Sequence, residues 1–268
     1  MTDGTVNVMC MKWGRYYSAD YINRLYAGVK ANLRRPFRFV CATDSTDGVD
    51  AGVECVALPP DPGLPVRRKW PNVHAKPMIF KKGYAGLEGP TLYLDIDLLV
   101  VGPLDKFFEW HPGDFCIIHN WVEMRKRLFR RLPDIGNSSC FRFDAGTEAS
   151  DHVYRSFMRD KDNPSLLRFF AKGSQKYQTR AMMEAGKVSW WPNEWVASFK
   201  RTCIPPFPLN LFIAPRYPRT ASVVAFHGNP DLPEAIPGYR TDRHGVSVPL
   251  HLRSLPAPWV EKAWKGTE

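Results

Sequence analysis

Residues 89–102 read Gly-Pro-Thr-Leu-Tyr-Leu-Asp-Ile-Asp-Leu-Leu-Val-Val-Gly, an apolar run interrupted by Asp95 and Asp97. The run has the length and the β-branched and aromatic content of a buried strand. An unpaired carboxylate in such a strand would cost several kcal/mol, so we expect a cation beside the pair. Because residues i and i+2 of an extended backbone point to the same side, both carboxylates can face one divalent ion, or one ion and a ligand hydroxyl.

An Asp-x-Asp triplet is a short motif that also arises by chance. Asp160 and Asp162 have the same spacing, but they lie in Arg-Asp-Lys-Asp-Asn-Pro, which is typical of a solvated loop. Asp95 and Asp97 differ in their setting, a strand that runs toward the carboxyl edge of an α/β sheet, where ligands bind. From the triplet alone, two interpretations stay open: a metal site, or a structural pair that caps a turn.

The composition is that of a globular protein. The chain has 268 residues, 44% of them hydrophobic, which is enough for one large α/β domain or two small ones. No stretch approaches about 18 uninterrupted apolar residues, and the N-terminus lacks the basic and apolar segments of an export signal. The six cysteines show no C-x-x-C spacing, so we expect buried thiols in a reducing cytoplasm.

The charge balance favours an anionic partner. Lys and Arg number 37 against 27 Asp and Glu, a formal net charge of +10. Such a charge suits nucleic acid, an anionic membrane or a phosphate-bearing substrate. Neither zinc-finger spacing nor an RNP-type aromatic strand is present, so no nucleic-acid partner is expected.

The first third of the chain alternates between strand and helix patterns. Strands are predicted over 6–11, 37–42 and 53–57, and a helix with apolar residues at helical spacing follows Ser18. This order indicates a Rossmann-like half. No G-x-G-x-x-G follows the first strand, so a dinucleotide cofactor is not indicated. The other predicted elements are a short helix over 75–84, the Asp95 strand, strands over 115–118 and 139–143, a helix over 175–185 and a strand over 222–226.

His227 directly follows the last predicted strand. Two carboxylates and an imidazole, from Asp95, Asp97 and His227, would suit manganese, although a lone histidine after a strand is more often structural. The surrounding sequence, Ala-Phe-His-Gly-Asn-Pro-Asp-Leu-Pro over 225–233, resembles the His-Gly-x-Pro-x-Pro segment of glycosyltransferase family 8 and its bacterial relatives. The resemblance covers roughly residues 5–235. Its other segments are 9–14, 21–26, 36–41, 91–100, 137–139, 173–177 and 192–200.

The resemblance implies the GT-A fold, an α/β fold with a Rossmann-like mixed central sheet flanked by helices in a single domain. Its glycosyltransferase domain would span 1–235, with a nucleotide-binding half over about 1–110 and an acceptor half over about 111–235. Residues 236–268 would form a basic and aromatic C-terminal tail.

The resemblance also implies a Mn²⁺-dependent (or Mg²⁺-dependent) hexosyltransferase of bacterial type. It would move a sugar from a nucleotide-diphosphate sugar, a UDP-sugar, to a glycan, lipid-linked or glycoconjugate acceptor with retention of configuration. Asp97 and His227 would be metal ligands, and Asp95 would be shared between metal and donor. Gln175, beneath the anomeric carbon, and Asp95 would be the catalytic residues. The residues implied in donor binding are Lys12, Trp13, Asn23, Tyr26, Lys76, Asp95, Asn137, Ser138 and Gly228.

Two positions depart from the family pattern. Ser174 stands where the family has Asp before the glutamine, and Asn229 stands where many relatives have Lys after His-Gly. The second change removes a cation from the diphosphate, so another Lys or Arg would have to replace it. An alternative therefore stays open, a catalytically weak or inactive nucleotide-sugar-binding scaffold. A nucleotidyltransferase would need a glycine-rich N-terminal loop that the sequence lacks.

Two segments combine basic and aromatic residues. Residues 121–131 contain five basic side chains, and the tail carries Trp259 and Trp264 beside lysines. Either could rest on anionic lipid at the inner face of a membrane, or could simply pack on the domain. Two interpretations are also open for Trp190, Trp191 and Trp195. These residues could form an aromatic wall for a sugar ring, or they could pack in the core.

Overall fold

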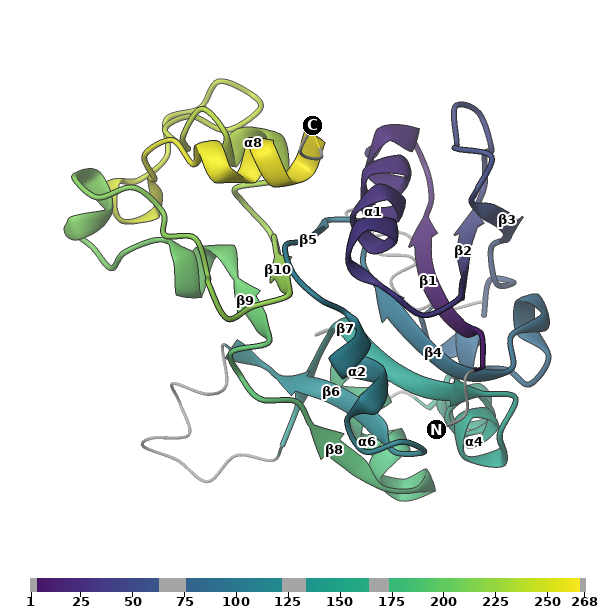
Figure 1. The fold of residues 1–268 in the computed structure, drawn as a ribbon. Helices are drawn as coiled ribbons and strands as arrows, with labels where there is room; N and C mark the ends of the chain where they lie inside the picture. The colour runs from purple at the N-terminus through teal and green to yellow at the C-terminus, as the bar shows by residue number, and fades with distance from the viewer. Residues whose placement is uncertain (1–3, 63–75, 122–133, 164–173, 266–268) are drawn as a thin grey trace. The chain divides into compact units, whose positions relative to one another are not determined.

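The computed structural model describes residues 4–62, 76–121, 134–163 and 174–265 (Figure 1). The chain forms two compact units that interleave along the sequence. The first unit contains residues 1–22, 35–95 and 105–191, and the second contains 23–34, 96–104 and 192–268. The chain thus passes from one unit to the other directly after Asp95.

The first unit is built on a mixed seven-stranded sheet. Its strands are β1 (Val6–Lys12), β2 (Phe37–Thr43), β3 (Glu54–Ala57), β4 (Gly89–Leu94), β6 (Phe115–His119), β7 (Gly136–Ala145) and β8 (Val188–Trp190), in the order β3-β2-β1-β4-β7-β6-β8. Only β7 runs against its neighbours β4 and β6. The other six strands therefore end at one edge of the sheet, where β7 begins.

Helices and short turns flank this sheet. They are α2 (Asp105–Glu109), α4 (Glu148–Asp160), α6 (Ser174–Ala185) and the 3₁₀ turns η1 (Lys76–Phe80) and η2 (Tyr84–Gly86). The helices α4 and α6 pack against each other, and both contact η1 (Figure 1). An aromatic cluster fills the core, with Phe80 4.6 Å from Phe143 and Tyr93 4.8 Å from Phe141 between ring centroids. The stacked rings of Tyr93 and Phe141 fix the end of β4 that leads to Asp95.

A buried arginine holds the connection from α2 to β6. Arg142 on β7 is 1% exposed. Its guanidinium donates hydrogen bonds to the main-chain carbonyls of Phe107, Phe108, Trp110, His111 and Asp114. Main-chain dipoles thus compensate a charge that would otherwise be costly to bury.

The second unit contains a three-stranded sheet, β5 (Leu98–Val100), β9 (Val196–Ser198) and β10 (Val223–Ala225). β10 lies in the middle, antiparallel to β5 and parallel to β9 (Figure 1). The other elements are a π-helical turn η3 (Phe199–Cys203), the 3₁₀ turns η4 (Leu209–Leu211) and η5 (Leu250–Leu252), and the helices α7 (Leu232–Ala235) and α8 (Pro258–Lys265). Helix α1 (Ala19–Asn32) begins in the first unit and continues in the second.

The expected α/β class, with a central sheet flanked by helices, is confirmed. The prediction of one continuous strand through Asp95 and Asp97 is wrong. Asp95 N still donates to Ser139 O of β7 at 2.8 Å, but Ile96 and Asp97 form a turn, and the chain continues as β5 in the other sheet. Two short buried strands in succession have the same composition as one long strand.

Other predicted elements differ from the structure in their type or in their bounds. The predicted helix over 75–84 is two 3₁₀ turns, because Gly83 and Ala85 have φ values of 76° and 53° that no α-helix accommodates. The helix over 175–185 is confirmed and begins one residue earlier. All six cysteines are free, and five are buried as expected, whereas Cys55 is half-buried. The division at residue 110 stays a prediction.

Candidate functional site

In the first unit, the cation beside Asp95 is Lys76. The Lys76 Nζ atom lies 2.7 Å from Asp95 Oδ1 and 2.8 Å from Oδ2, and it also donates to Ser138 O at 2.9 Å. Tyr93 donates its hydroxyl to Asp95 Oδ1 at 3.1 Å. Both charged side chains are largely buried, 12% and 24% exposed. Position 76, expected to contact a donor, thus neutralises one carboxylate of the triplet.

Asp44 orders the turn that carries Lys12 and Trp13. The Lys12 ammonium at the end of β1 lies 3.4 Å from Asp44 Oδ1, and Gly14 N donates to Oδ2 at 2.6 Å. Burial works against ionisation of Asp44, but the Gly14 hydrogen bond and the Lys12 charge together lower its pKa. Gly14 has φ 66°, which favours glycine in this tight turn. Our sequence reasoning missed Asp44, although a carboxylate directly after a parallel strand was a usable signal.

The start of β7 and the start of α6 are tied together. Thr179 on α6 donates to Gln175 O at 2.7 Å and accepts from Gly136 N at 3.1 Å. Gln175, itself half-buried, is thereby held near the residues that follow Gly136. Asn137 and Ser138 are buried there, and Asn137 Oδ1 accepts from Ser139 N at 2.9 Å. The side chain of Ser174 lies outside the described residues.

In the second unit, strand pairing brings Asp97 and His227 to one place. Leu98 of β5 faces Ala225 of β10, and Phe226 N donates to Asp97 O at 3.4 Å. His227 is the next residue, and its Nε2 lies 2.6 Å from Ser198 Oγ. Burial, and then the charges of two neighbouring cations, lower the pKa of His227 to about 4. The imidazole is therefore neutral near pH 7 and has a lone pair to offer a metal ion.

Those two cations are Lys200 and Arg201, on the η3 turn that follows β9. Ser198 caps this turn by accepting from Arg201 N at 3.2 Å. Burial and the Arg201 charge lower the pKa of Lys200. Within residues 4–62, 76–121, 134–163 and 174–265, neither cation forms an ion pair with a carboxylate. A half-buried lysine and an exposed arginine beside a neutral imidazole suit an anionic ligand.

Sequence reasoning gave Arg201 no role. A signal was present, because residues 195–230 contain four Lys or Arg and no Asp or Glu.

The remaining predicted residues divide between the units. Asn23, Tyr26 and Gly228 belong to the second unit with Asp97 and His227, whereas Lys12, Trp13, Lys76, Asp95, Asn137, Ser138 and Gln175 belong to the first. Asn23 and Tyr26 are half-buried on α1, and Gly228 is exposed with φ 76°. Trp191 is fully buried against Phe107, so that residue is core.

The donor chemistry of Asp97 and His227 fits a hard divalent ion. A carboxylate and a neutral imidazole are assembled by one strand pair, and both are ligands that Mn²⁺ accepts. In the described part of the chain, however, no three His, Cys, Asp or Glu side chains are grouped to hold a metal. Asp95 is engaged by Lys76 and Tyr93. The three-residue metal site therefore stays a prediction.

No protein-family model matches the sequence, and no curated protein matches it. Solved structures do match. The galactosyltransferase LgtC, in complex with donor and acceptor sugar analogues, has a TM-score of 0.56 at 14% identity over 85% of this chain and 89% of LgtC. An active-site Gln→Glu variant of LgtC has a TM-score of 0.52 at 14% identity.

Two longer glycosyltransferases match as well. The bifunctional WbbM has a TM-score of 0.54 at 10% identity, over 86% of this chain and 47% of WbbM. GlyE of Streptococcus pneumoniae has a TM-score of 0.50 at 13% identity, over 85% of this chain and 56% of GlyE. The expected structural resemblance is thus confirmed, and the chain has the GT-A fold that these glycosyltransferases share.

Proposed function

We propose that the chain is a metal-dependent, retaining glycosyltransferase that moves a sugar from a UDP-sugar to a glycan, lipid-linked or glycoconjugate acceptor. The observation that carries this proposal is the grouping of Asp97, His227, Lys200 and Arg201 around one strand end. A nucleoside diphosphate would balance the positive charge of Lys200, Arg201 and a bound divalent ion. The solved neighbours with the same fold are glycosyltransferases, and one of them binds donor and acceptor sugar analogues.

The reaction places negative charge on a phosphate oxygen as the nucleoside diphosphate leaves. A divalent ion held by Asp97 and His227 would stabilise that charge as a Lewis acid when bound. Lys200 and Arg201 bind the same diphosphate. They replace the cation that is lost where Asn229 stands in this chain.

The roles proposed for the first-unit residues follow from the resemblance to glycosyltransferase family 8. Asp95 accepts a hydrogen bond from a sugar hydroxyl, and the ion pair with Lys76 orients that carboxylate. Gln175 offers its amide to the reacting sugar beneath the anomeric carbon. The active-site glutamine of LgtC supports this role.

One observation favours the alternative, a nucleotide-sugar-binding scaffold with weak or no turnover. Asp95 already has an ammonium and a phenol as partners, so it competes poorly for a metal ion. Both functions predict binding of a nucleotide sugar, but only the glycosyltransferase is expected to turn it over.

Release of UDP from a panel of UDP-sugars, with Mn²⁺ or with EDTA, tests the proposal. Wild-type protein should hydrolyse one donor slowly with Mn²⁺ only, and Asp97→Asn should reduce that rate by about 100-fold or more. Asp162→Asn is the matched control, because it alters the other Asp-x-Asp triplet at a residue that is 77% exposed. Binding of a donor without turnover would establish the scaffold. Failure to bind any nucleotide sugar would overturn both.

A further inference from the structure

One loop of the second unit exposes its apolar side chains and buries its polar side chain. Arg216 N donates to Cys203 O at 2.9 Å, which closes the segment 204–215 into a compact loop, named here the apolar loop. Four large apolar side chains of this loop face solvent. They are Phe207 (54% exposed), Leu209 (47%), Phe212 (78%) and Ile213 (38%).

The polar side chain of the same loop points inward. Asn210 is 1% exposed, and its Nδ2 donates to Leu250 O at 2.9 Å and to Arg253 O at 2.8 Å. These bonds pin η4 against η5 and add Leu250, itself 49% exposed, to the apolar surface. The loop therefore presents its hydrophobic side chains on an ordered backbone.

This clustering is not a general property of the surface. Nine large hydrophobic residues are exposed in the described part of the chain, and seven of them belong to the second unit. The other two are Tyr16 and Met183. Contiguous exposed apolar side chains mark an interaction surface, whereas scattered ones need no explanation.

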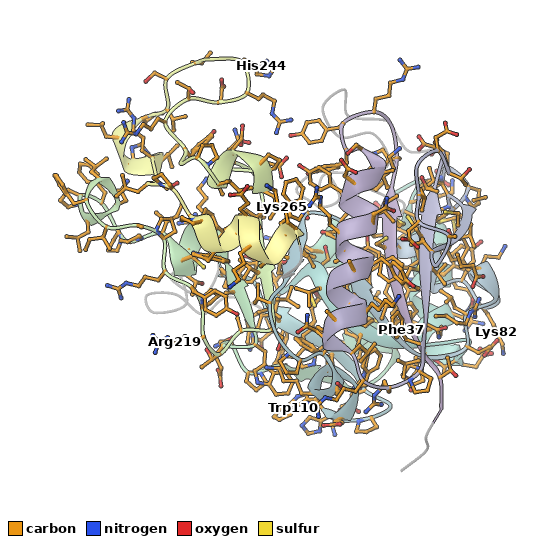
Figure 2. The ribbon with its side chains drawn as sticks, turned by 45° about the horizontal axis from the view of Figure 1, so that its top comes forward. Phe37, Lys82, Trp110, Arg219, His244 and Lys265 are labelled. Atoms are coloured by element: carbon orange, nitrogen blue, oxygen red, sulfur yellow. The ribbon has the colours of Figure 1, made fainter. Side chains whose placement is uncertain are left out.

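The charges around the apolar loop identify the class of partner. Arg216 and Arg219 follow the loop and are exposed, and Arg219 lies at the outer surface in Figure 2. No acidic residue occurs between 195 and 230. A second copy of this chain, at a net charge of +10, would bring like charge to the patch. An anionic bilayer offers both an apolar interior and phosphates for arginine.

We propose that the apolar loop and Leu250 insert into the interface of an anionic membrane, with Arg216 and Arg219 on lipid phosphates. This surface differs from the two segments for which the sequence left membrane contact open. Trp259 donates its Nε1 to Pro215 O at 3.0 Å, and Arg24 lies 4.6 Å over the Trp264 ring, so the tail packs within its own unit. Trp121 is buried, and 122–131 lie outside the described residues.

The inference is tested by flotation of the full chain with phosphatidylcholine vesicles, with and without phosphatidylglycerol. Wild type should float only with anionic vesicles. The double variant Phe207→Ser/Phe212→Ser should lose binding by about tenfold or more, because two apolar insertions are removed. Met183→Ser, an exposed apolar residue of the first unit, should bind as wild type does. Arg216→Gln/Arg219→Gln should weaken binding and reduce its dependence on salt.

Any of three results overturns the inference: no binding by wild type, equal binding to neutral vesicles, or unchanged binding of the double phenylalanine variant. Sedimentation velocity adds a fourth, a wild-type dimer that the double variant dissociates, which would assign the patch to self-association. Thermal unfolding of each variant checks that the fold is kept. UDP release by the same samples separates this inference from the proposed function, which does not depend on it.

Discussion

Ser198 Oγ lies 2.6 Å from Nε2 of His227, across 29 positions of sequence. The parallel pairing of β9 with β10 sets this contact, because Ser198 faces Ala225, two residues before the histidine. The same hydroxyl accepts from Arg201 N. One buried side chain therefore orients both the candidate metal ligand and the turn that carries two cations.

Replacing Ser198 by Ala should weaken Mn²⁺ binding by about tenfold or more, since partners of a ligating histidine typically contribute that much. Stability should fall by about 1 kcal/mol, because a cap is lost as well. Isothermal titration with Mn²⁺ and urea unfolding measure the two effects. Thr147→Ala is the matched control, because it removes the cap of α4 and should cost similar stability with no change in metal affinity. Equal metal affinity in both variants would refute the role of Ser198.

Lys200→Gln and Arg201→Gln should each lower the affinity for UDP by about tenfold, the usual magnitude for a charge-assisted hydrogen bond. Affinity for uridine should stay unchanged, because uridine has no phosphate. The comparison of UDP with uridine isolates the diphosphate from the base. Arg219→Gln removes an exposed cation of the same unit and should leave both affinities as they are. Equal losses for UDP and uridine would contradict a phosphate-binding role.

The pKa of His227 predicts a pH dependence of stability. Its value of about 4 in the folded protein lies below that of an exposed histidine, so between these values the unfolded chain binds more protons. Stability is thus fully present above about pH 6.5 and is lost as pH falls toward 4, by at most about 3 kcal/mol. Urea unfolding of wild type and His227→Gln from pH 7 to 4 measures this. The stability of wild type relative to the variant should fall as the pH is lowered, and a constant difference would exclude the effect.

The ion pair of Lys76 with Asp95 should be coupled energetically. Lys76→Met leaves a largely buried carboxylate without its cation and should cost about 1–3 kcal/mol. Adding Asp95→Asn should recover part of that loss, so the double-mutant cycle should give a coupling of about 1 kcal/mol or more. Lys82→Met breaks an exposed pair with Glu148 and should cost less stability than Lys76→Met does. Additive effects at 76 and 95 would show that the pair does not stabilise the fold.

The sequence predicted elements best where one local pattern suffices. The helix over 175–185 and the strands β1 and β2 were located to within a residue, because apolar periodicity and turn residues are local signals. The change of sheet at Asp95 could not be predicted, because pairing with β7 or with β10 is a long-range property. Asp160 was predicted in a solvated loop, but it ends α4 and accepts from the Tyr177 hydroxyl of α6 at 3.0 Å.

The candidate site likewise contains residues that the sequence selected and residues that only the fold brings into place. Motif likeness selected Asp97 and His227, and the pairing of β5 with β10 brings them together. Ser198 and Arg201 gain their positions only through the register of β9 on β10, which no spacing in the sequence reveals. The ion pair of Asp95 with Lys76 also could not be identified without the fold, because Lys76 is 19 residues away on another element.

Arg142 holds the segment from Phe107 to Asp114 through the main chain of that segment alone. Its five acceptors are all main-chain oxygens, so the identity of the side chains in that segment does not affect the clamp. Position 142 has no such freedom, because a lysine ammonium lacks the planar fork that reaches carbonyls in two directions. We expect libraries of this protein to accept diverse residues at the exposed position Glu109 while rejecting every substitution of Arg142.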